Sequence, residues 1–167
     1  ARECDHVCYI RSGPEIGVAA TKTFVGQQTA LNLLAEATTE GGADREVIAA
    51  LRDLPGNVQE VLDASKAESV AESYLDSDAY FFIGRALNFP VALEGALKMK
   101  EISYEHAEGF AAGELKHGPL ALVTDRTPIF ATVIGDDELA RKTVGNVKEV
   151  EARQAPVVAV TDGQSDV

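Results

Sequence analysis

Short apolar runs alternate with amphipathic segments in the second half of the chain. Three runs have strand length and no regular polar positions, at residues 79–83, 128–134 and 156–161. Amphipathic stretches at 90–104 and 138–153 lie between them and have helical spacing. Strands that are apolar on both faces are typical of a parallel sheet covered by helices on each side. With right-handed crossovers, the pattern predicts an α/β fold, a three-layer, doubly wound parallel sheet.

The first half of the chain is more polar, and its pattern is mainly helical. This half begins with a strand candidate at residues 6–10, which is followed by a segment with helical spacing at 20–37. Gly41 and Gly42 end that helical segment. Three further short helices are predicted, one capped by Asp44 and ending at Leu51, one beginning at Pro55 and one at 66–75. We expect these three helices to connect the opening segment to the sheet.

Composition and charge argue against several classes of function. The chain has 167 residues, of which 46% are hydrophobic and 25% charged, which is typical of a globular domain. Its 27 acidic and 15 basic residues give a net charge of −12, which argues against nucleic-acid binding and is compatible with a surface suited to high salt. No apolar run approaches the ~20 residues of a membrane span, and the N-terminus lacks a signal-peptide pattern. We therefore expect no membrane association and a cytoplasmic location.

Two cysteines near the N-terminus, Cys4 and Cys8, flank His6. On a strand these three residues would share one face, but a zinc site requires four ligands and the other histidines are His106 and His117. We interpret the cysteines as small buried hydrophobic residues. The sequence thus predicts no metal site and no cofactor.

Three charged residues share a narrow stripe on the predicted helix at 90–104. They are Glu94, Lys98 and Glu101, at spacings of four and three residues. Alanine, leucine and methionine fill most of the remaining helix surface, and an unpaired buried charge costs several kcal/mol. From the spacing alone, an ion-pair ladder without further function is the favoured interpretation.

The next segment, residues 106–120, concentrates ionisable residues and glycines and is too broken for one regular element. Loops that carry such groups on a rigid scaffold are often functional. His117 lies between Lys116 and the Gly118-Pro119 pair, and a histidine that titrates near neutrality can move protons. A lone histidine is nevertheless more often structural.

Two strings resemble the glutamine:fructose-6-phosphate amidotransferase family. ALEGALKMKEISYEHAEGFAAGELKHGPLALV resembles the second sugar-isomerase (SIS) domain of that family, and SGPEIGVAATKTF resembles the closing strand, loop and helix of its first SIS domain. The resemblance implies that residues 1–42 are the C-terminal portion of a first SIS domain. Residues 43–167 would then be a helical connector and a second SIS domain that is truncated at its C-terminus.

The resemblance also implies a reaction and catalytic residues. The isomerase half of the family converts fructose 6-phosphate and glutamine-derived ammonia into glucosamine 6-phosphate. By position, Glu101 resembles the carboxylate base that moves a proton between C1 and C2, and Lys98 its charged neighbour. His117 resembles the ring-opening acid and base, which in the family reaches the site of a neighbouring subunit. We thus expect a phosphosugar substrate, a homodimer and a glutaminase domain in the parent chain.

Residues 18–22 resemble the sugar-contacting loop of the family. Val18, Ala20 and Thr21 would contact substrate, and the helix that begins near Thr21 would offer backbone N–H groups to an anion. Ala20 stands where the family commonly has serine, so one hydroxyl contact is missing. The phosphate cradle, the cysteine nucleophile and the Schiff-base lysine of the family have no counterparts here, and we expect the isolated chain to be inactive.

Two alternatives stay open at the level of sequence. The first is a free-standing SIS module that binds or senses a phosphosugar without turnover, in which the charged stripe is structural. The second is a related phosphosugar isomerase or deglycase, which would keep Glu101 and His117 but change the leaving group.

Overall fold

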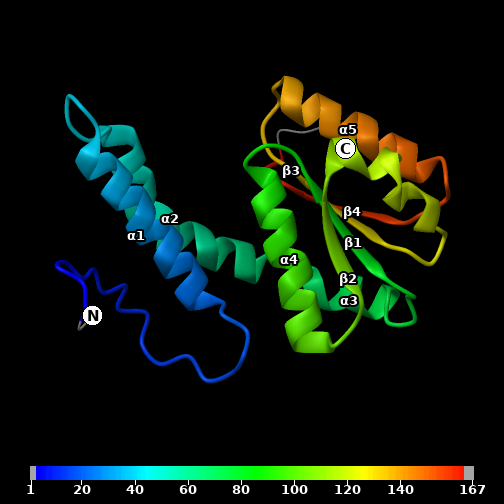
Figure 1. Ribbon diagram of the computed structural model, residues 1–167, viewed down its shortest axis with the longest axis horizontal. Helices are drawn as coiled ribbons and strands as arrows, with labels where there is room; N and C mark the ends of the chain where they lie inside the picture. The colour runs from blue at the N-terminus through cyan, green and yellow to red at the C-terminus, as the bar shows by residue number, and fades with distance from the viewer. Residues whose placement is uncertain (1–2, 164–167) are drawn as a thin grey trace. The chain divides into compact units, whose positions relative to one another are not determined.

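The computed structural model describes residues 3–163 (Figure 1). The chain divides into two compact units, with the boundary between Ser69 and Val70. Unit 1, which precedes this boundary, is helical, and unit 2, which follows it, contains the sheet. No helix among the described residues is long and apolar enough to cross a membrane.

Unit 1 contains two long helices, α1 (Lys22–Thr38) and α2 (Arg45–Asp63), and the short helix α3 (Ala67–Ser73) spans the unit boundary. Asp44 caps α2, because its carboxylate accepts a hydrogen bond of 2.8 Å from the backbone N–H of Glu46. The break predicted before Pro55 is wrong, since α2 continues through it. Proline has a helical φ and removes one N–H, and here the amphipathic helix continues despite that loss.

The opening segment differs from its prediction in two respects. Residues 6–10 form no strand, because a strand requires a hydrogen-bonded neighbour and none of the described strands pairs with this segment. Cys4 and Cys8 are free and exposed rather than buried. The helices of unit 1 bury no residue fully, so this unit offers no core in which a cysteine could be enclosed.

Unit 2 is built on four parallel strands in the order β2-β1-β3-β4. The strands are β1 (Tyr80–Gly84), β2 (Ala107–Ala111), β3 (Ile129–Val133) and β4 (Val157–Thr161). Helix α4 (Asn88–Ser103) connects β1 to β2, and α5 (Glu138–Glu151) connects β3 to β4. Two 3₁₀ helices, η1 (Ala112–His117) and η2 (Pro119–Leu122), lie between β2 and β3. The predicted doubly wound parallel sheet is confirmed, and β2 is a strand that the apolar pattern did not predict.

The sheet separates two apolar cores, which makes the unit three-layered. On one face, Phe81 and Ile83 of β1 pack with Ile129 of β3 against residues of α5 and η1, including Val147. On the other face, Tyr80 packs with alanines of α4 and β2, and the rings of Phe82 and Phe130 stack with centroids 4.8 Å apart. Alternate residues of β1 thus enter opposite cores, which explains its unbroken apolar sequence.

Helix α4 lies unusually close to the sheet, because glycines occupy the contact points. A Cβ atom at Gly109 of β2 would lie 3.0 Å from the Cα atom of Leu93, and a Cβ atom at Gly95 would lie 2.8 Å from the ring of Phe82. Such distances leave no room for a side chain. The close contact fixes the position of α4 and of the charged residues that it carries.

Candidate functional site

The charged stripe lies on the last turns of α4, where Lys98 connects two glutamates. Its Nζ atom is 2.5 Å from Oε2 of Glu101 and 3.4 Å from Oε1 of Glu94. Each of the three side chains is at most a quarter exposed. Among the described residues, Oε1 of Glu101 accepts no hydrogen bond. One carboxylate oxygen is thus held by an ammonium, while the other is available to a substrate.

Lys98 keeps its positive charge at neutral pH. The hydrogen bond to Glu101 raises the pKa of Lys98 above its ordinary value of 10.5; partial burial opposes this effect, and Glu94 adds to it. A permanently charged ammonium is unsuited to act as a base or an amine nucleophile, because both roles require the neutral form. Its suitable role is to orient Glu101 and to compensate the negative charge of the two glutamates.

His117 lies at the opposite edge of the sheet from Glu101. Helix α4 begins after the carboxyl end of β1 and runs back, so that Glu101 is about 20 Å along its axis from Asn88, near the amino ends of the strands. Helix η1, which ends at His117, begins directly after the carboxyl end of β2. His117 is exposed, and within the described part of the chain its imidazole makes no hydrogen bond or ion pair. One chain therefore does not bring this imidazole to the Lys98–Glu101 pair.

Arg85 fixes η1 at the carboxyl edge of the sheet. Its guanidinium donates a hydrogen bond of 2.9 Å to Oδ1 of Asn146, a buried residue of α5. A Cβ atom at Gly113 of η1 would lie 2.9 Å from the same Nη2 atom, so the guanidinium packs directly against that turn. These contacts connect the β1–α4 turn, η1 and α5, and they hold the segment that ends in His117. Sequence reasoning gave no such role to Arg85.

The loop that resembles a sugar-contacting segment lies in unit 1. Val18 is 86% exposed and Thr21 is exposed, whereas Ala20 is half-buried. The backbone N–H groups at the start of α1 are not open to a ligand, because the carboxylate of Glu15 accepts hydrogen bonds from the N–H groups of Thr21 at 3.1 Å and Lys22 at 3.0 Å. An anion supplied by the chain itself thus occupies the place where we expected an external one.

Glu15 is held as a carboxylate by these hydrogen bonds. They lower the pKa of Glu15 from 4.5 to about 2, and the hydroxyl of Thr23 makes the largest contribution. When folding lowers the pKa of a carboxyl group, that group stabilises the fold fully at any pH above its pKa in the unfolded state. This contribution is lost as the pH falls toward its pKa in the folded state. The stabilisation by Glu15 is therefore complete above about pH 4.5 and is lost between pH 4.5 and 2.

We expect Glu15→Gln to abolish the pH-dependent loss of stability that the carboxyl group of Glu15 causes in the wild type. Amide hydrogen exchange at Thr21, Lys22 and Thr23 should accelerate between pH 4.5 and 2 in the wild type, relative to the intrinsic rate. The glutamine variant should exchange faster already at pH 6 and should lack that pH-dependent step. The difference between the exchange rates of the two proteins reports on Glu15 alone, because the other carboxylates are the same in both. Identical exchange profiles would contradict the assigned role of this carboxylate.

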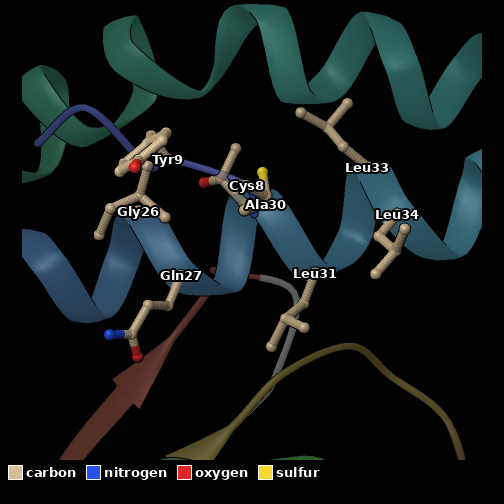
Figure 2. A pocket seen from close by; sticks show the side chains of 10 residues that line it. Cys8, Tyr9, Gly26, Gln27, Ala30, Leu31, Leu33 and Leu34 are labelled. Carbon is tan, nitrogen blue, oxygen red and sulfur yellow. The ribbon is translucent and has the colours of Figure 1, made fainter. Parts of the chain in front are cut away.

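Unit 1 also contains an apolar hollow of about 740 Å³ between residues 8–10 and helix α1. Figure 2 shows Cys8 near Ala30 and Tyr9 near Gly26, with Leu31 and Leu34 farther along the helix. None of its lining residues is charged. The hollow is therefore chemically unsuited to a phosphosugar, which requires polar and cationic groups. Among residues 3–163, no cluster of three or more histidine, cysteine or acidic residues is placed to hold a metal ion.

Comparison with known proteins agrees with the fold. A family model for the SIS domain matches residues 73–167, which is more than half of the chain. The chain belongs to the SIS domain family. The match begins at Ser73, the last residue of α3, and includes the rest of unit 2. It therefore includes Lys98, Glu101 and His117.

The relatives of this SIS domain chain are much longer proteins. It is 54% identical over 169 residues to glutamine–fructose-6-phosphate aminotransferase (isomerizing) of Halobacterium salinarum, covering 95% of this chain and 28% of that protein. The protein of the same name from Methanosarcina acetivorans is 50% identical over 170 residues, covering 98% of this chain and 27% of that one. The chain thus spans little more than a quarter of the length of these curated relatives.

A solved structure has the same fold as this SIS domain chain. The C-terminal domain of glucosamine-fructose-6-phosphate aminotransferase from Francisella tularensis superposes with a TM-score of 0.78 at 39% identity. The superposition covers 90% of this chain and 44% of that chain.

Proposed function

We propose that the chain is the isomerase part of an enzyme that makes glucosamine 6-phosphate from fructose 6-phosphate and glutamine-derived ammonia. The observation that carries this proposal is the Lys98–Glu101 pair, in which Nζ holds one carboxylate oxygen at 2.5 Å and the other oxygen is open. Support comes from two relatives at 54% and 50% identity that are named for the aminotransferase reaction. The alternative interpretations are not better supported, because the relatives of highest identity named here carry the aminotransferase name.

Glu101 performs the proton transfer that converts a ketose into an amino aldose. After the sugar ring opens, ammonia adds to the C2 carbonyl and water leaves, which gives an imine at C2. The open carboxylate oxygen of Glu101 removes a proton from C1 while the imine nitrogen takes up a proton, which gives an enolamine. Glu101 then returns its proton to C2 while the C1 hydroxyl loses its own. This places the aldehyde at C1 and the amine at C2. Lys98 orients the carboxylate of Glu101 through its contact with Oε2.

His117 acts as the acid and base of ring opening, and it does so across a dimer interface. It protonates the ring oxygen while the C2 hydroxyl loses its proton, and a histidine near neutrality can serve both functions. Its place at the edge of the sheet opposite to Glu101 supports a homodimer in which each site takes Glu101 from one subunit and His117 from the other.

The remaining parts of the proposal concern the full-length protein. Residues 1–42 close a first SIS domain, and residues 43–167 are the connector and part of a second one. Val18, Ala20 and Thr21 contact the sugar, and a glutaminase domain supplies ammonia to this site in the cytoplasm. The lengths of the relatives support a longer parent chain, because each is more than three times as long as the matched region, and their shared name supports glutamine as the source of ammonia.

The direct test is an assay of the full-length protein with fructose 6-phosphate and glutamine. Formation of glucosamine 6-phosphate, measured by mass spectrometry or by acetylation of the amine, is the expected result. Binding of fructose 6-phosphate without any product would instead favour a sensing module. Release of ammonia from an amino sugar phosphate, without net synthesis, would favour a deglycase.

A further inference from the structure

The carboxylate of Glu15 is the centre of a hydrogen-bond network in unit 1. Its Oε1 atom accepts from the backbone N–H of Thr21 at 3.1 Å, the Thr21 hydroxyl at 2.8 Å and the backbone N–H of Lys22 at 3.0 Å. Its Oε2 atom accepts from the backbone N–H of Thr23 at 3.4 Å and from the Thr23 hydroxyl. The ammonium of Lys22 donates to the carbonyl of Pro14 at 2.7 Å, which adds a second connection between the same two segments.

This network replaces the usual cap of helix α1. Thr21 occupies the N-cap position but makes no side-chain hydrogen bond to the helix, because its hydroxyl donates to Glu15. The first N–H groups of a helix have no partner within the helix, and a negative charge near them is stabilised. The carboxylate of Glu15, six positions before Thr21 and seven before Lys22, satisfies these groups across a loop.

The intervening loop, residues 16–20, has little else to define its shape. Ile16 is 99% exposed and Val18 is 86% exposed, so neither side chain anchors the loop in a core. Gly17 has a φ of 143°, which lies in the region where glycine is favoured. Glu15 at one end and Thr21 to Thr23 at the other are thus the contacts that close the loop.

We propose that Glu15 is a positioning residue, a built-in anion that holds the loop from Val18 to Thr21 in the shape that contacts the sugar. This inference rests on the proposed function, which assigns the sugar contact to that loop. Glu15 does not touch the substrate; it acts through the backbone of Thr21 and Lys22. Because it fills the amino end of α1, the phosphate of the substrate binds elsewhere, and the loop receives the uncharged part of the sugar.

The test removes the carboxylate and then returns it as a small molecule. In the full-length protein, Glu15→Ala should raise KM for fructose 6-phosphate about tenfold, with a smaller change in kcat and no change in glutamine hydrolysis. Acetate has the carbon and oxygen atoms that this substitution deletes, and we expect millimolar acetate to restore KM at least in part. Glu15→Gln, which keeps the volume but not the charge, should raise KM without responding to acetate.

Glu36→Ala is the matched control. Glu36 also uses its carboxylate to hold backbone in unit 1, by accepting a 2.7 Å hydrogen bond from the N–H of Asp44, but it has no contact with residues 15–23. Its KM should stay at the wild-type value with and without acetate. An equal rise of KM in this control, an unchanged KM in Glu15→Ala, or a raised KM that acetate does not lower would overturn the proposal.

Amide hydrogen exchange separates this inference from the proposed function. If the wild-type protein made no glucosamine 6-phosphate, the proposed function would fail, but exchange at Thr21, Lys22 and Thr23 could still be measured. Faster exchange in Glu15→Ala that slows again with acetate would support the positioning role of Glu15. Exchange that equals the wild type, or that ignores acetate, would overturn it.

Discussion

Glu101→Gln in the full-length protein is expected to lower glucosamine 6-phosphate formation by about 10²- to 10⁴-fold, the usual contribution of a general base, and to leave glutamine hydrolysis intact. Glutamine has nearly the shape of glutamate, so the packing of α4 against β1 and β2 is retained. An amide, however, neither removes the C1 proton nor pairs with the ammonium of Lys98 as a carboxylate does. Product formation and glutamine hydrolysis are measured on the same preparation.

Glu138→Gln provides the control for loss of a carboxylate. Glu138 also pairs with a lysine on its own helix, since its Oε1 atom is 2.7 Å from Nζ of Lys142, but this pair is exposed on α5. Its substitution should leave isomerisation unchanged. Near-normal product formation by Glu101→Gln, or an equal loss in Glu138→Gln, would remove Glu101 from the mechanism.

Gly84→Ala is expected to destabilise unit 2 by about 3 kcal/mol, the upper part of the range for overpacking. A Cβ atom at Gly84, the last residue of β1, would lie 2.2 Å from the carbonyl oxygen of Asn88 and 2.9 Å from the backbone nitrogen of Phe89. These are backbone atoms of the first turn of α4, so no side-chain rotation relieves the clash. The start of the helix must move, and its contacts with β1 and β2 are disturbed. Urea unfolding followed by circular dichroism measures the loss.

Gly145→Ala is the matched control for this substitution. Gly145 lies inside α5, is exposed, and has no atom within 4 Å of the position of an added Cβ. Alanine is the better helix former, so the variant should be more stable than the wild type by about 0.5–1 kcal/mol. Equal stability of Gly84→Ala and the wild type would mean that α4 does not pack against β1 as closely as described.

The sheet was predictable where strands are buried on both faces. The run at residues 79–83 predicted β1, because every position of that strand meets a packed layer. Strand β2 was missed because it contains Gly109, which is required by the close approach of the backbone at Leu93. A glycine that serves a contact across the fold weakens the local strand pattern, and a single sequence does not reveal that contact.

The site was predictable only where its contacts are local. Glu94, Lys98 and Glu101 are close in sequence on one helix, and helical spacing was sufficient to bring them together. The contact between Arg85 and Asn146 joins residues 61 positions apart and depends on the packing of α5. Glu15 acts through backbone N–H groups, which have no signature in the side-chain pattern. Long-range and backbone-mediated contacts thus required the structure.

Mixing two inactive variants tests most directly whether Glu101 and His117 form one site across two subunits. Full-length Glu101→Gln and His117→Ala are each expected to be inactive for isomerisation when pure. In a hybrid dimer, one of the two sites would combine the intact Glu101 of one subunit with the intact His117 of the other, so random mixing should restore about a quarter of wild-type activity. No recovery after verified subunit exchange, or substantial activity in either pure variant, would contradict the account.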